Sequence, residues 1–348
     1  MPVSLPSDVH PGLAAARPAR AAGPLPDADS LRAAYLELLK LGLCDLCGTS
    51  TVSVGRSEDG SVWSREMSGD HLRLRAAGMD WPLTGLTMAG LNRLDDLQAC
   101  VESVVRERVD GDLIEAGCWR GGASILMRAA LDALGAEDRV VWVADSFEGF
   151  PEEQGEGALS LYDFLAVPEE EVRGNFERFG LGEGVSFVAG FFEQTLPPLS
   201  GRSWSLVRLD GDTYEATRVA LRSLYPGLSP GGYLIVDDYG AFEDCRRAVD
   251  EFRSEHGIEE PIEEVDWTCV RWRRVNPAPL DVTPPPVRDA APRAPSRERE
   301  GHVPTVRELD LRKQISDLEK RLAAAEDLVN WLHGSPFRGA RAWLRGLR

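Results

Sequence analysis

Two short acidic segments stand where apolar runs end. Asp210 and Asp212 follow the run SLVRL, and Asp237 and Asp238 follow the run YLIV. If these runs are adjacent parallel strands, their ends bring four carboxylates to one edge of a sheet, where mutual repulsion favours a bound cation. Oxygen ligands without a nearby histidine favour Mg²⁺ or a similar hard divalent ion over zinc. The segments therefore predict a cation site, with two ordinary Asp-rich turns as the alternative.

A glycine-rich loop is the second chemical feature. The run DLI leads into Glu115, and Gly117, Gly121 and Gly122 follow before the helical stretch ASILMRAALDAL. Glycines at this point let the backbone approach a ligand closely at the carboxyl edge of a sheet. The spacing is not the dinucleotide G-x-G-x-x-G, and no G-K-[ST] follows to hold phosphates. The loop predicts a nucleotide-type site, with a merely tight turn as the alternative. The residues expected to contact the ligand are Glu115, Gly117, Gly121 and Gly122.

An acid ends the next apolar run. VVWVAD closes on Asp145, about 30 residues after the loop begins. A carboxylate there can accept hydrogen bonds from both ribose hydroxyls, which suits an adenosine ligand without a 2′-phosphate. Together with the loop it favours S-adenosylmethionine, with capping of the following turn as the alternative role of Asp145. Further cofactor contacts are expected from Trp119, Ser146, Phe191 and Phe192, the last two as walls for adenine.

Alternating strands and helices must position these residues. Apolar runs typical of buried strands lie at 113–114, 140–144, 185–188, 206–209 and 233–236. Each is followed by turn residues or a helical stretch. This alternation predicts an α/β fold in which helices cover both faces of a mostly parallel sheet.

The segments before this domain are of three kinds. Residues 1–29 are rich in Ala, Pro and Ser and predict a flexible leader. A helix is expected after Ser30, which would cap it. Its apolar residues at helical spacing are Leu31, Tyr35, Leu38 and Leu39. Residues 48–79 predict a long irregular loop serving as a lid, so 30–84 form an N-terminal helix and lid region ahead of the main domain at 85–276.

The C-terminal part has a different composition. Residues 277–304 contain eight prolines and predict an extended linker. Residues 305–348 follow, and their apolar positions, spaced alternately by four and three, predict a C-terminal coiled-coil helix and a homo-oligomer. These positions are Leu311, Ile315, Leu318, Leu322, Ala325, Val329 and Leu332. The last fifteen residues carry four arginines and no acid, which leaves open a weak membrane-surface association or a solvated end.

Composition and charge exclude several classes of protein. The chain has 348 residues, of which 43% are hydrophobic and 28% charged, so it is neither disordered throughout, collagenous nor a multi-spanning membrane protein. The net charge of -18 argues against nucleic acid as a partner. No apolar run approaches the roughly 20 residues that cross a bilayer, and we expect a cytoplasmic protein. Cys44 and Cys47 form a C-x-x-C without the rest of a zinc set, and packed or idle thiols are expected.

The motifs, taken in order, resemble those of one family. Between roughly residues 35 and 274 the chain contains GMDWP, TMAGLNRLDDLQ, GDLIEAGCWRGGASILMRA, VWVADSFEGFP, RLDGDTYEAT, GGYLIVDDYG, CRRAVDEFR and DWTCVRWRR. This series is similar to the bacterial macrocin-type O-methyltransferases, metal-dependent enzymes that methylate sugar hydroxyls of natural products. The resemblance implies a Rossmann-like class I methyltransferase fold and a metal held by Asp210, Asp237 and Asp238. It also implies Asp212 or Asp210 as the catalytic base.

The expected reaction is methylation of a sugar hydroxyl in a natural product or glycan. A sulfonium methyl group is already electrophilic, so the protein must mainly align the acceptor oxygen and help remove its proton. Vicinal sugar oxygens can chelate the expected ion. The vicinal oxygens of a phenolic or catechol acceptor could do the same, which is one alternative. A non-enzymatic coiled-coil assembly protein on a retained scaffold is another, and the intact carboxylates argue against it.

Overall fold

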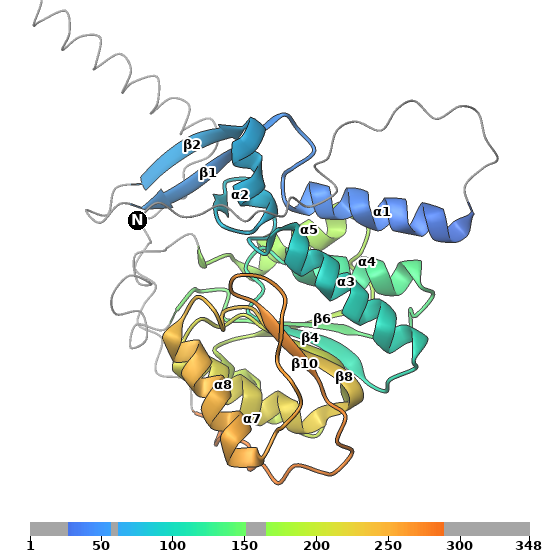
Figure 1. Ribbon diagram of the computed structural model, residues 1–348, viewed down its shortest axis with the longest axis vertical. Helices are drawn as coiled ribbons and strands as arrows, with labels where there is room; N and C mark the ends of the chain where they lie inside the picture. Colours follow the sequence, from blue (N-terminus) through green and yellow to red (C-terminus); the bar gives the residue numbers. More distant parts are fainter. Residues whose placement is uncertain (1–26, 57–61, 151–164, 289–348) are drawn as a thin grey trace, which may run out of the picture. The chain divides into compact units, whose positions relative to one another are not determined.

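The computed structural model describes residues 27–56, 62–150 and 165–288 (Figure 1). The predicted leader up to residue 26, the predicted coiled coil and the basic C-terminal end lie outside the described residues. Within the described ranges, every helix is too short or too polar to cross a membrane.

A seven-stranded sheet forms the centre of the body. Its strand order is β6-β5-β4-β7-β8-β10-β9. The strands are β4 (Asp112–Ala116), β5 (Val141–Asp145), β6 (Val185–Ala189), β7 (Trp204–Leu209), β8 (Leu228–Val236), β9 (Glu263–Glu264) and β10 (Val270–Arg273). Pairing is parallel from β6 through β8, and β10 is antiparallel to both of its neighbours. The sheet is therefore mostly parallel, as predicted.

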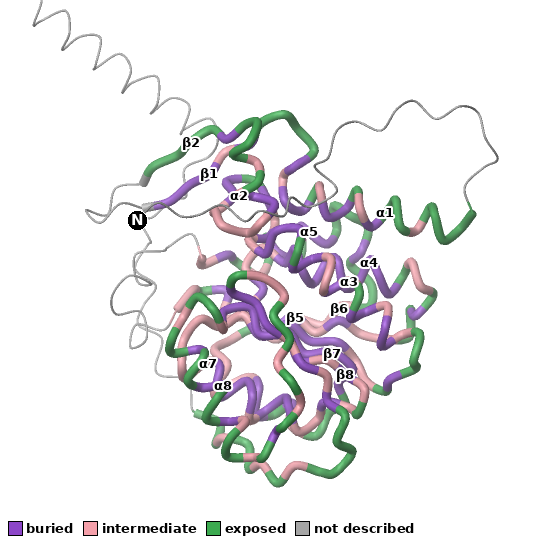
Figure 2. The backbone as a smooth tube through the Cα atoms, viewed as in Figure 1, coloured by how far each residue is buried: buried purple, intermediate pink, exposed green. Residues whose placement is uncertain are grey.

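Helices cover both faces of this sheet (Figure 1). They are α3 (Gly90–Arg106), α4 (Gly122–Ala133), α5 (Glu169–Arg178), α6 (Phe192–Thr195), α7 (Tyr214–Leu224) and α8 (Glu243–His256), with short 3₁₀ turns η5 (Pro197–Leu199) and η6 (Tyr225–Gly227). Successive strand residues point to opposite faces. Leu113 accordingly packs in the core shared with α3 and α4, whereas Ile114 packs in the core shared with α7 and α8. The strands between the two cores are largely buried (Figure 2).

The chain changes direction across the sheet between β4 and β7. From β4 it proceeds to β5 and β6 on one side, while β7 and β8 lie on the other side. Open α/β sheets bind ligands beyond the carboxyl ends of the strands at such a reversal. Gly117, Asp145, Asp210 and Asp237 all lie at or just after these strand ends, so the topology gathers the predicted site residues at one edge.

The N-terminal helix α1 (Ala28–Leu43) starts earlier than predicted. Asp27 caps it in place of Ser30, because Oδ1 of Asp27 accepts a hydrogen bond of 2.7 Å from the Ser30 N–H. The buried face contains only one of the four apolar residues noted at helical spacing. Its large apolar residues are Leu36, Leu39 and Leu43, whereas Leu31, Tyr35 and Leu38 are exposed. Apolar residues occupy more of this helix than one face can bury, so their spacing alone could not identify the buried face.

The described residues between 50 and 76 are mostly in strands and helices, and the prediction of an irregular loop is wrong for them. The elements are β1 (Ser50–Arg56), β2 (Val62–Ser68), η2 (Gly69–His71), α2 (Leu72–Ala76) and, just beyond, β3 (Trp81–Pro82). β1 pairs antiparallel with both β2 and β3. β-branched residues favour such a strand, but the side chains that β1 buries include the polar Thr51 and Ser53. Their burial hides the alternation of polar and apolar residues that reveals most half-buried strands.

A buried arginine holds this N-terminal hairpin in place. Arg75 of α2 is only 1% exposed. It donates to the Asp80 carboxylate at 2.8 and 3.0 Å and to Thr51 Oγ1 at 2.9 Å. Cys44 and Cys47, which lie before the hairpin, are free thiols, buried and exposed respectively. Arg75 thus joins α2 to β1 and to Asp80, and the role of this segment as a lid stays a prediction.

The first part of the predicted linker packs on the body. Leu280 and Val282 contact the core on the α7 and α8 side. The Arg288 N–H donates to the Glu193 carbonyl at 3.2 Å, and the Arg288 guanidinium lies 3.4 Å from a Glu215 oxygen. Residues up to 288 therefore belong with the body, and a free linker would have to start later than residue 277.

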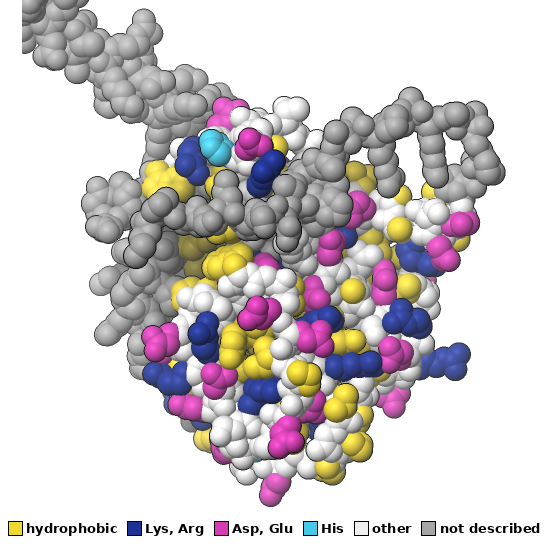
Figure 3. Space-filling view, viewed as in Figure 1, with side chains coloured by type: hydrophobic (Ala, Val, Ile, Leu, Met, Phe, Trp, Pro, Cys, Tyr) yellow, Lys and Arg dark blue, Asp and Glu magenta, His cyan; other side chains and the backbone are white. Residues whose placement is uncertain are grey.

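Charge is distributed differently at the surface and at the sheet edge. Acidic and basic side chains are mixed over the described part of the face shown in Figure 3. Glu115, Asp237 and Asp238, in contrast, are acids buried at the carboxyl edge of the sheet. Such groups require positive partners or a shift in pKa to remain buried.

Candidate active site

A cavity of about 750 Å³, including its open mouth, lies at the carboxyl edge of the sheet. Eight predicted site residues line it: Gly117, Trp119, Asp145, Ser146, Phe191, Phe192, Asp210 and Asp212. Met88, Phe150 and Leu165 add apolar wall that the sequence patterns did not indicate. The predicted residues Glu115, Gly121, Gly122, Asp237 and Asp238 are not among its lining residues.

Only glycine fits at position 117, because two strand ends approach each other closely there. Its φ is +92°, a region that favours glycine. A Cβ atom added there would lie 1.7 Å from the Asp210 carbonyl oxygen. The Gly117 N–H also donates to the Ala144 carbonyl at 2.8 Å. Gly117 therefore lets the ends of β4, β5 and β7 converge on the floor of the cavity.

Gly121 and Gly122 serve packing at the start of α4. Gly121 has a φ of +85°, and a Cβ atom there would approach Val172 Cγ1 to 2.8 Å. A Cβ atom on Gly122 would lie 2.5 Å from the Leu86 carbonyl oxygen. The absence of side chains at these positions lets the start of α4 pack closely against Val172 and Leu86. Contact of either glycine with the cofactor stays a prediction.

Asp145 ends β5 and organises the glycine-rich loop. Its Oδ2 accepts hydrogen bonds from the N–H groups of Cys118 at 2.8 Å and Trp119 at 3.3 Å. Its Oδ1 accepts one from the Phe147 N–H at 2.8 Å. Asp145 thus caps the following turn, which was its alternative predicted role, and it also lines the cavity. Its hydrogen bonds to ribose hydroxyls stay a prediction.

Glu115 lies beneath the cavity. The carboxylate is 1% exposed and accepts hydrogen bonds from Ser124 Oγ and, at 2.6 Å, from Arg208 Nη1. Burial raises the pKa of Glu115 to about 7, although Arg208 opposes the shift. Both oxygens have partners within the protein, so in this structure Glu115 supports the loop and its direct contact with a cofactor stays a prediction.

The ends of β7 and β8 bring their acids together. One oxygen each from Asp210, Asp237 and Asp238 lies within 4.8 Å of the others. β8 ends at Val236, so the chain is already turning at the Asp237-Asp238 pair and both side chains can approach the same point. Asp212, at φ +55°, donates its N–H to Asp238 Oδ2 at 3.1 Å.

Three of these acids hold protons more strongly than usual. Burial raises the pKa of Asp238 well above its ordinary value, and the neighbouring Asp212 adds to the shift. Burial and Asp210 together raise the pKa of Asp212 to about 7. The pKa of Asp210 rises because of burial and the charge of Asp237. The cluster therefore contains more negative charge than its surroundings neutralise.

Asp237 differs from these acids because two buried arginines neutralise it. Arg208 Nη2 donates to Oδ1 and Arg93 Nη1 donates to Oδ2. Burial acts to raise the pKa of Asp237, but these two guanidinium groups lower it overall. Arg208 also donates to Asp210 Oδ2 at 2.8 Å and so joins three carboxylates, with Glu115 as the third.

Neither Arg93 nor Arg208 is among the predicted site residues. Arg208 carried a signal, because a charge inside the apolar run SLVRL must find partners if the strand is buried. Arg93 carried none, since a charged residue on an amphipathic helix usually faces solvent. Its partner Asp237 is 144 residues away in the chain, and only the fold joins them.

The acid cluster fits a hard divalent cation. Oxygen-only ligands within a few ångströms of one another are what Mg²⁺ prefers, and Asp210, Asp237 and Asp238 supply them. Burial, and then repulsion by the neighbouring acids, raises the pKa of Asp238, and a positive charge there would oppose both effects. Asp237 would contribute one of its two oxygens, each of which also accepts a hydrogen bond from one arginine.

Comparisons with known sequences confirm the resemblance inferred from the motifs. The profile of the family described as Macrocin-O-methyltransferase (TylF) matches residues 49–274. The chain is 51% identical over 208 residues to the 8-demethyl-8-(2,3-dimethoxy-alpha-L-rhamnosyl)-tetracenomycin-C 4′-O-methyltransferase of Streptomyces olivaceus, covering 57% of this chain and 79% of that relative. It is 43% identical over 211 residues to the Mycinamicin III 3″-O-methyltransferase of Micromonospora griseorubida, covering 58% and 83%.

A solved structure confirms the fold. The structure of the O-methyltransferase NovP matches with a TM-score of 0.63 and 39% sequence identity, covering 70% of this chain and 100% of that chain. The strand order, with its antiparallel β10 beside β8, and this match establish the predicted class I methyltransferase fold.

Proposed function

Because the chain belongs to the macrocin O-methyltransferase family, we propose that it methylates a sugar hydroxyl of a natural product or glycan, using S-adenosylmethionine and a divalent metal ion. One observation supports this most strongly. A single cavity is lined both by Gly117 and Asp145, which suit the cofactor, and by Asp210 and Asp212, which suit proton transfer. Donor and acceptor sites would therefore adjoin, as direct methyl transfer requires.

The chain's own residues align the two reactants and receive a proton. The loop around Gly117, held by Asp145, would place the sulfonium so that its methyl carbon faces the acidic end of the cavity. The acceptor oxygen forms a bond to that carbon, the carbon–sulfur bond breaks, and its electron pair stays on sulfur. Asp212 takes the hydroxyl proton as general base.

Asp212 suits the role of base better than Asp210 does. Asp210 Oδ2 is bound by Arg208 at 2.8 Å, and a carboxylate paired with a guanidinium accepts a proton less readily. Asp212 lines the same cavity, and its pKa of about 7 suits exchange of a proton near neutral pH. A divalent ion, when bound to Asp210, Asp237 and Asp238, would lower the pKa of the acceptor alcohol.

The relatives support a sugar acceptor. The name of the Streptomyces olivaceus enzyme specifies a rhamnosyl-bearing tetracenomycin as its acceptor. Methyl α-L-rhamnopyranoside, methyl β-D-glucopyranoside and catechol form a panel that separates sugar from phenolic acceptors. Turnover of at least one glycoside is expected, measured as release of S-adenosylhomocysteine and as methylated product. Methylation of catechol alone would favour the phenolic alternative.

Asp212→Asn tests the base directly. Loss of a general base should lower kcat by roughly 10²- to 10⁴-fold, while S-adenosylmethionine binding, measured by calorimetry, stays near that of the wild type. Asp110→Asn is the matched control, because Asp110 is an exposed acid just ahead of β4. Near-normal kcat in Asp212→Asn would exclude Asp212 as the base and leave Asp210 in that role.

A further inference from the structure

Trp267 is a large aromatic residue that stays half exposed beside the candidate active site. It lies between β9 and β10, and its exposed fraction is 49%. Large apolar side chains usually bury most of their surface on folding. Trp267 is not itself among the residues that line the cavity, but Arg93, which lies beside its ring, pairs with Asp237.

The indole of Trp267 is held by the segment that precedes α3. Its Nε1–H donates to the Ala77 carbonyl at 3.2 Å. Arg93 lies beside the ring, with its Cζ atom 6.0 Å from the ring centroid, a distance at which a guanidinium and an aromatic ring attract each other. The ring is therefore oriented by contacts within the protein.

Arg93 is itself firmly fixed. Besides Asp237, it contacts Asp266 at 3.1 Å and donates to the carbonyl groups of Gly78 at 2.9 Å and Met88 at 3.2 Å. Asp266 in turn accepts hydrogen bonds from the two backbone N–H groups that follow Trp267 in the chain. Arg93 and the backbone that follows Trp267 are thus both held by hydrogen bonds or ion pairs.

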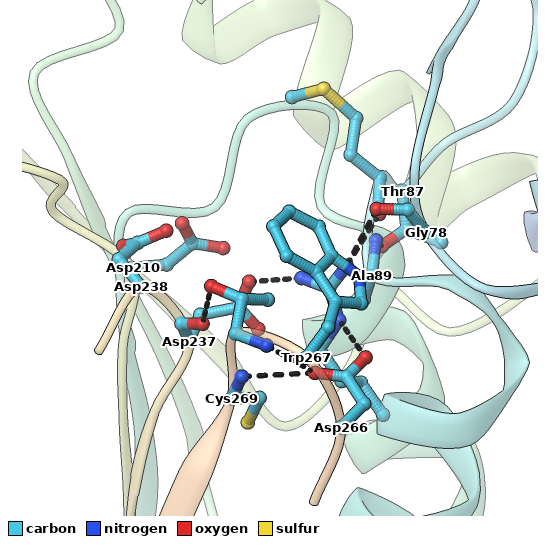
Figure 4. A network of polar contacts seen from close by, with 12 residues as sticks. Gly78, Thr87, Ala89, Asp210, Asp237, Asp238, Asp266, Trp267 and Cys269 are labelled. Carbon is cyan, nitrogen blue, oxygen red and sulfur yellow. Dashed lines mark hydrogen bonds and ion pairs between the residues drawn. The ribbon is translucent and has the colours of Figure 1, made fainter. Parts of the chain in front are cut away.

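This network places Trp267 next to the acidic end of the cavity. Thr268, the next residue, donates its Oγ1–H to the Asp237 carbonyl at 2.9 Å. Met88, one of the residues bound by Arg93, lines the cavity. Figure 4 shows the indole standing between the carboxylates of Asp210 and Asp237 on one side and Gly78 on the other.

We propose that Trp267 is a specificity-determining residue that stacks against the apolar face of the acceptor sugar ring. The proposal rests on the proposed function, since it assumes a sugar acceptor. One face of a pyranose ring carries C–H groups, and packing them on an indole removes apolar area from water. An indole that is already oriented loses little conformational freedom when the sugar binds. Stacking would turn a chosen hydroxyl toward Asp212.

Two variants separate stacking from anchoring. Trp267→Ala removes the ring, whereas Trp267→Phe keeps an aromatic face but loses the N–H donor to Ala77. With the methyl glycoside that the wild type methylates fastest, KM for the glycoside should rise about tenfold in Trp267→Ala, equivalent to about 1.4 kcal/mol. Trp267→Phe should stay within about threefold of the wild type, because stacking needs only the ring. KM for S-adenosylmethionine should not change in either variant.

Trp63→Ala is the matched control, since Trp63 is also about half exposed, at 41%, but lies on β2 against Gly55 and not beside Arg93. Wild-type KM for the glycoside in Trp267→Ala would overturn the proposal. A fall in kcat at constant KM, equal in Trp267→Ala and Trp267→Phe, would also overturn it and show that Trp267 only anchors Ala77. Failure of the wild type to methylate any glycoside would instead contradict the proposed function, and the stacking proposal with it.

Discussion

Asp145 shows how one side chain can organise a loop and still serve a ligand. Its two oxygens accept three backbone N–H groups, from Cys118, Trp119 and Phe147. A carboxylate offers about four acceptor positions, and the Ser146 hydroxyl takes the fourth at 3.5 Å, so a ribose hydroxyl would replace this long contact. The cap and the cofactor contact are compatible.

We predict that Asp145→Ala weakens S-adenosylmethionine binding. Hydrogen bonds to a charged acceptor are worth roughly 1 to 3 kcal/mol, which corresponds to a rise in Kd of about 5- to 150-fold. The loop should also lose order, because the Cys118 and Trp119 N–H groups lose their partner. Calorimetric titration measures the change, with Asp110→Ala as a surface control. An unchanged Kd would remove Asp145 from the site.

At this scale the sequence locates acids better than it locates their partners. Asp145, Asp210 and Asp237 could be placed because each ends or follows an apolar run, and parallel strands end at one edge. Arg93 reaches Asp237 from a helix far away in the chain, and no local pattern reports such a pairing. The charge state of the cluster therefore required the structure.

At the scale of elements, the sheet follows from the sequence and the N-terminal hairpin does not. The central strands are buried on both faces, which gives continuous apolar runs. β1 buries the polar Thr51 and Ser53, so its pattern lacks the usual contrast between faces. In α1 the apolar residues Leu31 and Leu38 are exposed, because propensity and spacing do not determine which side of the helix the body covers.

Gly117→Ala tests how tightly β4 and β7 converge. The added Cβ atom would meet the Asp210 carbonyl at 1.7 Å, and φ of +92° is unfavourable for alanine. Loss of S-adenosylmethionine binding and a lower midpoint of urea unfolding are expected.

Gly174→Ala is the control for this substitution, since no atom lies within 4 Å of a Cβ atom at that helical position. It should leave binding intact and raise stability by up to about 1 kcal/mol. If Gly117→Ala bound the cofactor as the wild type does, the convergence of strand ends would not define the floor of the site.

At the scale of the whole molecule, the body extends further than the composition of the chain suggests. Proline-rich sequence begins at residue 277, yet Leu280, Val282 and Arg288 contact the body. Proline favours an extended backbone whether the segment is free in solvent or packed on the protein. Composition therefore cannot distinguish a free linker from an extended segment that packs on the body. The apolar seam at 311–332 remains a prediction of self-association and of a homo-oligomer.

Two truncations test this division of the chain. An end after Arg288 should preserve turnover of a soluble glycoside and reduce the assembly size measured by analytical ultracentrifugation, because the predicted coiled coil is removed. An end after Val275 should lower thermal stability as well, since the contacts of Leu280 and Val282 are lost. Loss of turnover in the longer truncation would show that the tail belongs to the active unit.

The role of a metal ion is the central claim, and turnover after metal removal tests it most directly. The enzyme, stripped of tightly bound ions and assayed in excess chelator, should be inactive, and added Mg²⁺ should restore turnover. Asp238→Asn should resist restoration while still binding S-adenosylmethionine; it is preferable to a change at Asp237, which also neutralises two buried arginines. Full activity of the stripped enzyme in excess chelator would contradict metal-assisted transfer. The mechanism would then consist only of alignment of the reactants and proton removal by a general base.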